Sequence, residues 1–295
     1  MLSTRQLRYF VEIAESGSFS AAAERLFIAQ SALSRQIKDM ETRLQTPLFE
    51  RTARQPRLTA AGEAFLPRAR NLINELNKAS ALATEIGQGQ RGTLRLCHSS
   101  TVPISGRLLH DMSAYLEQQP GVSLDIGSLS SEAQLEELAE GRLDIGLLRL
   151  PVLRQREGVQ IVPLYTERLL LAVPANHRLA LAEAVDLAQL KDEAFISIPH
   201  PQRGGLSYLC ADLCMRHGFF PQAARVMSRK TTQLQLIQAG FGIALLPESM
   251  QDIAPTGVRF LPLTSDCQST VALASRQNPT PLVRHFLQTF TGECL

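Results

Sequence analysis

The chain has 295 residues, of which 44% are hydrophobic and 20% charged, and its net charge is +2. This length exceeds what one compact domain needs, and the composition is that of a globular protein rather than a disordered one. No apolar run is long enough to cross a bilayer and the N-terminus lacks a signal-peptide core, so we expect a cytoplasmic protein with no membrane partner. The five cysteines and six histidines show no metal-ligand spacing, so we expect no disulfide framework, no metal site and no cofactor.

Positive charge is concentrated in the N-terminal third of the chain. Residues 1–91 hold 13 Lys and Arg against 9 Asp and Glu, whereas the remainder is net negative. Arg51, Arg54 and Arg57 recur at every third position, in a stretch with no acidic residue between 52 and 59. Such a patch suits the binding of phosphate groups, and taken alone it also fits an ordinary solvated surface.

Three helices are predicted before this basic patch. Apolar residues over 7–14 have helical spacing, and Ser18 or Ser20 can cap a short second helix. A third helix over 31–44 has one apolar face, formed by Leu33, Ile37, Met40 and Leu44, and one polar face, formed by Ser31, Ser34, Arg35 and Lys38. Hydroxyl, guanidinium and ammonium groups on one helix face can bond to base edges in a major groove. These features indicate a winged helix-turn-helix; a plain helical bundle fits the periodicity equally well but leaves the basic segment unexplained.

Residues 10–62, FVEIAESGSFSAAAERLFIAQSALSRQIKDMETRLQTPLFERTARQPRLTAAG, resemble the DNA-binding signature of the LysR-type transcriptional regulators. The resemblance implies a sequence-specific regulator, an activator or a repressor, that binds double-stranded operator DNA and has RNA polymerase as a further candidate partner. It assigns contacts in the groove to Gln30, Ser31, Ser34, Arg35 and Lys38, and contacts from the wing to Arg51 and Arg54. Many relatives carry proline where this chain has Ser31, so the base preference is left open.

A long helix should follow the DNA-binding domain, which we place at 1–60. Apolar residues alternate spacings of four and three, as in a coiled coil, at Phe65, Ala69, Leu72, Leu76, Ala79, Ala83 and Ile86. Pro67 inside this segment predicts a kink. We expect a dimerising linker helix over 61–91, with a single helix buried on its own domain as the alternative; the family resemblance favours the dimer and extends it to a homotetramer.

Residues 92–295 show the pattern of an α/β sensor domain. Short apolar runs alternate with helical segments, which favours mostly parallel sheets covered on both faces. The LysR resemblance continues in ELAEGRLDIGLLR and QLIQAGFGIALLPES. It implies two subdomains like those of periplasmic solute-binding proteins, the first comprising 92–163 and 268–295 and the second 164–267.

Hydroxyl groups precede several of the predicted helices of this domain, where free backbone N–H groups favour anions. Together with one arginine they suit a small anionic effector, most simply a carboxylate. By resemblance to relatives that bind aromatic or short organic acids, the predicted effector-binding residues are Ser99, Ser100, Ser130, Arg149 and Thr231, with Arg203 of the 201–205 loop as a second cation. The alternative for each Ser or Thr is an ordinary helix cap.

The alternatives to this function are an enzyme, a solute-binding protein and a redox-responsive regulator. An enzyme is not expected, because no nucleophile motif or phosphate-binding loop is present. A solute-binding protein would need export and would leave residues 1–60 unexplained. A redox-responsive member of the same family remains open, because Cys210 and Cys214 are four residues apart on a predicted helix, although buried cysteines are more often inert.

Overall fold

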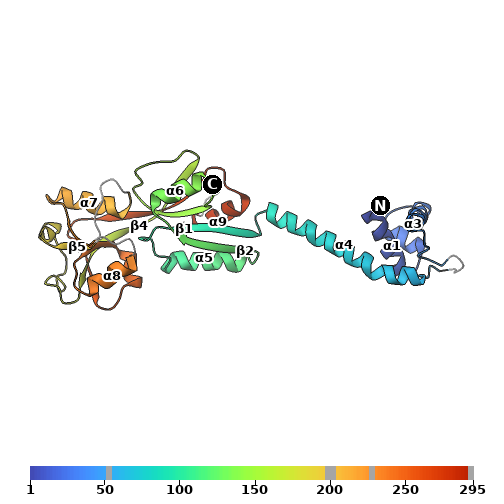
Figure 1. Cartoon of the computed structure of the whole chain (residues 1–295), viewed down its shortest axis with the longest axis horizontal. Coiled ribbons are helices and arrows are strands. Elements are labelled where there is room, and N and C mark those ends of the chain that lie inside the picture. Colours follow the sequence, from blue (N-terminus) through green and yellow to red (C-terminus); the bar gives the residue numbers. More distant parts are fainter. Residues whose placement is uncertain (51–54, 197–203, 226–229, 292–295) are drawn as a thin grey trace. The chain divides into compact units, whose positions relative to one another are not determined.

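The computed structural model describes residues 1–50, 55–196, 204–225 and 230–291, which form two compact units, Met1–Glu85 and Ile86–Leu295 (Figure 1). Within these ranges, no helix combines the length and the apolar character that spanning a membrane requires.

The described residues of the N-terminal unit form three short helices and all but the last two residues of a long one. These are α1 (Thr4–Ser16), α2 (Phe19–Arg25), α3 (Gln30–Leu44) and α4 (Ala60–Gly87). Ser3 caps α1 by accepting the N–H of Gln6, and Ser18 caps α2 by accepting the N–H of Ala21. The three predicted helices are therefore present, and the first two begin where a serine side chain accepts one of their free N–H groups.

Aromatic side chains hold these helices around one core. The ring of Phe10 on α1 lies 5.5 Å from that of Phe49 and 5.4 Å from that of Phe65 on α4, measured between ring centres. Phe10, Leu33 and Met40 are completely buried. The core thus joins α1 and α3 to the first turns of α4, and it fixes which face of α3 is left to solvent.

Helix α4 is 28 residues long and continues through Pro67. Thr59 caps it by accepting the N–H of Gly62 at 3.1 Å. From its middle onward the apolar side chains are exposed: Leu72 is 56% exposed, Leu76 43% and Ile86 55%. We call Leu72, Leu76, Ala79, Ala83 and Ile86 the α4 stripe; a single chain leaves it uncovered.

The C-terminal unit is built on a mixed sheet of seven strands in the order β2-β1-β3-β9-β4-β7, with β8 also paired to β4. The strands are β1 (Gly92–His98), β2 (Val122–Ser128), β3 (Ile145–Arg149), β4 (Val159–Pro174), β7 (Ala244–Pro247), β8 (Val258–Leu261) and β9 (Gln268–Arg276). A second, two-stranded sheet pairs β5 (Ala194–Ile196) with β6 (Gln222–Arg225).

Strand direction differs from the expectation of mostly parallel sheets. Strands β1, β2 and β3 are parallel, but β9 runs antiparallel to β3 and β4, and β7 and β8 run antiparallel to β4. The reason is that β4 carries the chain from the first subdomain to the second, and the chain returns to the first subdomain as it enters β9. The two strands therefore run in opposite directions and pair antiparallel. Figure 1 shows β4 between the side that carries α5 and α6 and the side that carries α7 and α8.

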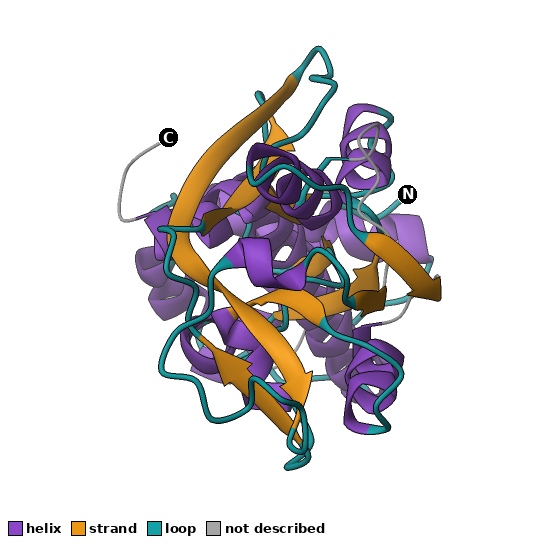
Figure 2. Ribbon diagram, turned by 90° about the vertical axis from the view of Figure 1, so that its left-hand side faces the viewer, coloured by secondary structure: helices purple, strands orange, loops and turns teal. Residues whose placement is uncertain are grey.

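Within the described part of this unit, five helices and two 3-10 turns surround the strands; Figure 2 shows the long strands in orange among the purple helices. They are α5 (Gly106–Gln118), α6 (Ser131–Ala139), α7 (Leu206–Arg216), α8 (Lys230–Gln238), α9 (Pro281–Thr291), η1 (Leu187–Leu190) and η2 (Glu248–Ile253).

Each subdomain has its own apolar core, and β4 belongs to both. Residues 159–168 of β4 pair with β9, whereas residues 169–174 pair with β7 and β8. Leu164 packs against the first core, while Leu169 belongs to the second. Along β4, the pairing partner therefore changes from β9 to β7 between residues 168 and 169.

Candidate DNA interface and effector site

The outer face of α3 presents the polar groups of the candidate DNA interface. Leu33, Ile37 and Met40 are buried against the core, which turns the opposite face to solvent. All five groove residues predicted from the sequence are exposed there, namely Gln30, Ser31, Ser34, Arg35 and Lys38. Ala29 gives α3 no side-chain cap, so the first N–H groups of the helix are open to a phosphate.

The base of the predicted wing follows α3. Phe49 and Leu58 form an antiparallel bridge, and the N–H of Glu50 donates to the carbonyl of Arg57 at 2.9 Å. The carboxylate of Glu41 accepts the N–H groups of Leu48 and Phe49 at 2.7 and 3.1 Å, which ties this base to α3. Arg51 and Arg54, the predicted wing contacts, lie outside the described residues.

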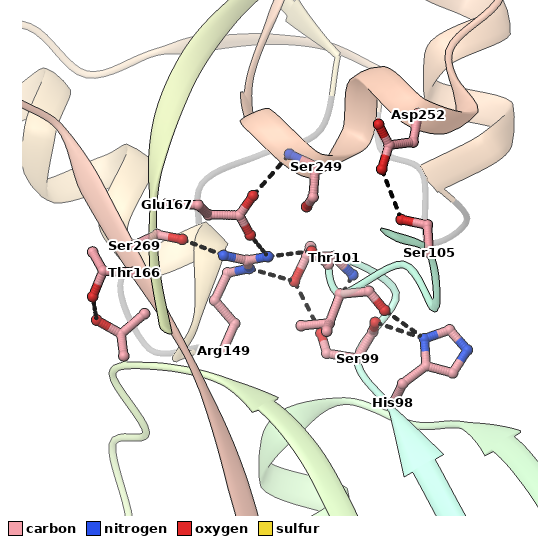
Figure 3. Close-up of polar contacts among 12 residues, drawn as sticks. His98, Ser99, Thr101, Ser105, Arg149, Thr166, Glu167, Ser249, Asp252 and Ser269 are labelled. Atoms are coloured by element: carbon pink, nitrogen blue, oxygen red, sulfur yellow. Dashed lines mark hydrogen bonds and ion pairs between the residues drawn. The ribbon is translucent and has the colours of Figure 1, made fainter. Parts of the chain in front are cut away.

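In the C-terminal unit, Arg149 at the end of β3 is completely buried (Figure 3). Its Nη2 lies 2.8 Å from Oε1 of Glu167, and its Nε donates to Oγ1 of Thr101 at 3.1 Å. The guanidinium also donates to the carbonyl of Thr101 and to the hydroxyl of Ser269. Burial lowers the pKa of Arg149, and the charge of Glu167 opposes that shift.

This environment differs from the one expected for Arg149, which the sequence places open to a cleft as the partner of a carboxylate. Its carboxylate partner belongs to the protein, because β9 and β4 bring Glu167 beside the end of β3. Glu167 is not among the predicted site residues, and no local pattern reveals it, since its pairing with Arg149 depends on the register of three strands.

Arg149 holds the segment that follows β1 through Thr101. The hydroxyls of Thr101 and Ser99 lie 3.0 Å apart, and Ser99 donates its N–H to the carbonyl of Leu147 at 2.9 Å. Ser99 is buried, whereas Ser100 is half-exposed and has no hydrogen-bond partner among the described residues. Both predicted hydroxyls therefore lie on a firmly held segment, and that of Ser100 is available to a ligand.

The second subdomain reaches the same region at the start of α7. The N–H of Gly204 donates to Oε1 of Glu132 at 2.8 Å, and the N–H of Gly205 donates to the carbonyl of Pro151 at 2.6 Å. Gly205 has a φ of +67°, and a Cβ there would lie 3.2 Å from the carbonyl oxygen of Arg149, so a side chain would be strained. Helix α7 begins directly afterwards without a side-chain cap.

The remaining predicted effector residues divide into two groups. Ser130 acts as a helix cap, because its hydroxyl accepts the N–H of Ala133 at 3.2 Å. Arg203 and the side chain of Thr231 lie outside the described part of the chain. A neighbour that was not singled out, Ser131, is buried and accepts the N–H of Arg149 at 3.3 Å.

Two further hydrogen bonds join the subdomains on the other side of Arg149. Oε2 of Glu167 accepts the N–H of Ser249 at 2.8 Å, and the hydroxyl of Ser105 donates to Oδ2 of Asp252 at 3.0 Å (Figure 3). A cavity of about 260 Å³ lies beside them. It is lined by Pro103, Ser105, Gly106, Arg107, Leu108, Asp111, Leu164, Tyr165, Ser249, Asp252 and Phe290, and by none of the predicted effector residues whose side chains the structure describes.

Two family models match the chain. Residues 4–63 match the bacterial regulatory helix-turn-helix protein, lysR family, and residues 87–295 match the LysR substrate binding domain. The regulator TfdS of Cupriavidus pinatubonensis is 34% identical over 292 residues, which is 96% of each chain. The uncharacterised regulator YnfL of Escherichia coli is 32% identical over 265 residues, or 90% of this chain and 89% of that protein.

Solved structures give the same result. The chain is similar to the LysR family regulator CbnR in complex with its target DNA, with a TM-score of 0.84, 26% sequence identity and full coverage of both chains. The similarity thus extends over α3, α4 and the whole C-terminal unit. The chain belongs to the LysR family and is a DNA-binding transcriptional regulator with an effector-binding domain.

Proposed function

We propose that a small organic acid controls this regulator by binding between the two subdomains, against the 99–101 segment and the start of α7. The observation that carries the proposal is the half-exposed hydroxyl of Ser100, which has no partner within the described residues although both neighbours of Ser100 are buried and hydrogen-bonded. A ligand there would contact the first subdomain through Ser100 and the second through the segment that begins at Gly204.

The electrostatics favour an anion held by oriented donors rather than by a free cation. Glu167 already compensates the charge of Arg149, so a carboxylate gains from hydroxyls and from the N–H groups of the first turn of α7. Arg149 acts as a positioning residue that keeps Thr101 and Ser99 in place. The nearby cavity suits a carboxylate less well, because Asp111 and Asp252 line it and its one lining cation, Arg107, is already paired with Asp111.

A panel of aromatic and aliphatic carboxylates, each paired with its uncharged amide, tests the proposal by calorimetric titration of the full-length protein. We expect an acid to bind and its amide to bind more weakly. Ser100→Ala should weaken binding of that acid by about fivefold, the equivalent of one hydrogen bond of roughly 1 kcal/mol. Leu164→Trp, which fills the cavity beside Asp252, serves as the control and should leave binding unchanged. The opposite pattern in the two variants would place the effector in the cavity instead.

We also propose that the protein acts as a dimer joined through the α4 stripe, so that two recognition helices read two half-sites of an operator. The uncovered apolar side chains of α4 support this assembly. Contacts between sensor domains would extend it to a tetramer. Such a regulator works in the cytoplasm, where the DNA lies, and RNA polymerase is its candidate partner at a promoter.

A further inference from the structure

Phe27 lies in the turn between α2 and α3, and its side chain is 94% exposed. Its φ is +55°, the left-handed region that bulky residues rarely adopt. Two hydrogen bonds hold the backbone there: the N–H of Phe27 donates to the carbonyl of Glu24 at 3.1 Å, and that of Ile28 donates to Ala23 at 3.0 Å. This is the Schellman pattern that ends a helix, and its left-handed position usually carries glycine.

The same pattern recurs in this chain, which allows a direct comparison. Gly141, Gly218 and Gly240 occupy the left-handed position after α6, α7 and α8, with the same pair of backbone bonds. Gln45 occupies it after α3, with a φ of +52°. A large aromatic ring stands at this position only after α2, among the helix ends that the structure describes.

The fold of the N-terminal unit does not account for this ring. The next residue, Ile28, packs against the core and supplies the apolar contact that usually accompanies this type of helix end. The ring of Phe27 is left in solvent. A strained backbone and an exposed aromatic ring at one residue point to a function, because strain of this kind is retained mainly where a site uses it.

The position of the turn indicates what the ring contacts. Phe27 precedes the first residue of α3, Gln30, by three positions, and the N-terminal end of a recognition helix is the part that meets base edges in the major groove. A residue just before that end reaches the rim of the groove, where DNA offers thymine methyl groups and the apolar faces of deoxyribose. Phenylalanine is one of the side chains that pack on a thymine methyl.

We propose that Phe27 is a DNA-contact residue whose ring packs on the apolar surface of the operator beside the recognition helix. It adds an apolar contact to the polar face formed by Gln30, Ser31, Ser34, Arg35 and Lys38. The left-handed backbone is what directs the ring away from the core and toward the DNA.

The test compares Phe27→Asn with wild-type protein on the duplex that the wild type selects from a random-sequence pool, by fluorescence anisotropy. Asparagine tolerates the left-handed backbone, so the variant should fold and melt a few degrees higher than wild type. Its affinity for the duplex should fall about fivefold to tenfold, since partial burial of an aromatic ring is lost. Gln45→Asn is the matched control: it also relieves a left-handed residue, and its affinity should equal that of wild type.

Replacing each thymine of the selected duplex by uracil separates the two apolar surfaces. A contact with a thymine methyl makes one replacement weaken the wild type but not Phe27→Asn, whereas a contact with deoxyribose gives no such position while the loss in Phe27→Asn persists. The proposal is overturned if Phe27→Asn binds the duplex as tightly as wild type. If that variant with unchanged affinity also loses transcriptional control, the ring contacts a protein instead of the DNA.

Discussion

At the scale of single residues, the buried pair of Arg149 and Glu167 determines how firmly the 99–101 segment is held. Removing one partner of a buried ion pair leaves an uncompensated charge, which typically costs about 3–5 kcal/mol. We therefore expect Glu167→Ala to lower the free energy of unfolding of the C-terminal unit by an amount in that range. Urea denaturation followed by circular dichroism measures it.

The exposed pair of Arg168 and Glu248 provides the control, since its side chains are 62% and 40% exposed. Glu248→Ala should change the free energy of unfolding by less than about 1 kcal/mol, because solvent screens exposed pairs. Equal effects of the two substitutions would show that the pair of Arg149 and Glu167 does not stabilise the C-terminal unit more than an exposed ion pair does.

The cysteines give a second prediction at this scale. Burial raises the pKa of the Cys214 thiol to about 12, so at pH 8 roughly one molecule in 10⁴ carries the reactive thiolate. We expect Cys214 of the native protein to resist alkylation by iodoacetamide at pH 8 and to react readily once urea exposes it. Peptide mass spectrometry measures both rates. Rapid alkylation of the native protein would revive the redox-responsive alternative.

At the scale of elements, the α4 stripe makes a prediction about assembly. Leu76 is 43% exposed in a single chain, and a dimer that covers it would have to bury any residue placed there. Leu76→Glu should therefore dissociate the dimer, because a buried unpaired carboxylate is strongly unfavourable. Asn74→Glu adds the same charge on the opposite face of α4 and should leave the mass unchanged. Light scattering coupled to size exclusion distinguishes the two outcomes.

The exposed face of α3 makes a separate prediction about recognition. Arg35→Ala should cost about 1–3 kcal/mol of binding to the selected duplex and relax the preference at one base pair, if the guanidinium bonds to a base edge. Arg43 lies near the other end of α3 and donates to the carbonyl of Met1, so Arg43→Ala should leave base preference intact. An unchanged preference profile in folded Arg35→Ala would remove that residue from the groove.

Elements with local signals were predictable, and elements that depend on distant pairing were not. Helices α1 to α4 have apolar periodicity, and α2 and α4 also have the caps Ser18 and Thr59, so their ends fall within a few residues of the prediction. The predicted strand direction is wrong because nothing near β9 indicates that it pairs with residues of β3 and β4 that lie a hundred or more positions earlier. The same limit explains the site: Ser100 could be placed at a strand end, but the partner of Arg149 could not be found without the register of β4.

At the scale of the whole molecule, an effector can act only if its affinity differs between two arrangements of the subdomains. The bond between Ser105 and Asp252 joins the two subdomains, and neither residue belongs to the 99–101 segment. Removing this hydrogen bond should favour an open arrangement, in which the two subdomains lie further apart than in the closed arrangement that has the bond. The proposed ligand contacts are unchanged by this removal. The apparent affinity for the effector then falls in proportion to the lost population of the closed state.

Ser105→Ala should therefore raise the effector concentration needed for half-maximal response by about fivefold, the equivalent of one hydrogen bond of roughly 1 kcal/mol. The variant should still bind the operator without effector, since residues 1–60 are unchanged. Footprinting of the selected duplex over a range of effector concentrations measures both quantities in one experiment. Thr93→Ala removes an exposed contact with Ser123 inside the first subdomain and should leave the response unaltered. A response that is equally sensitive to both substitutions would mean that closure of the two subdomains is not the signal.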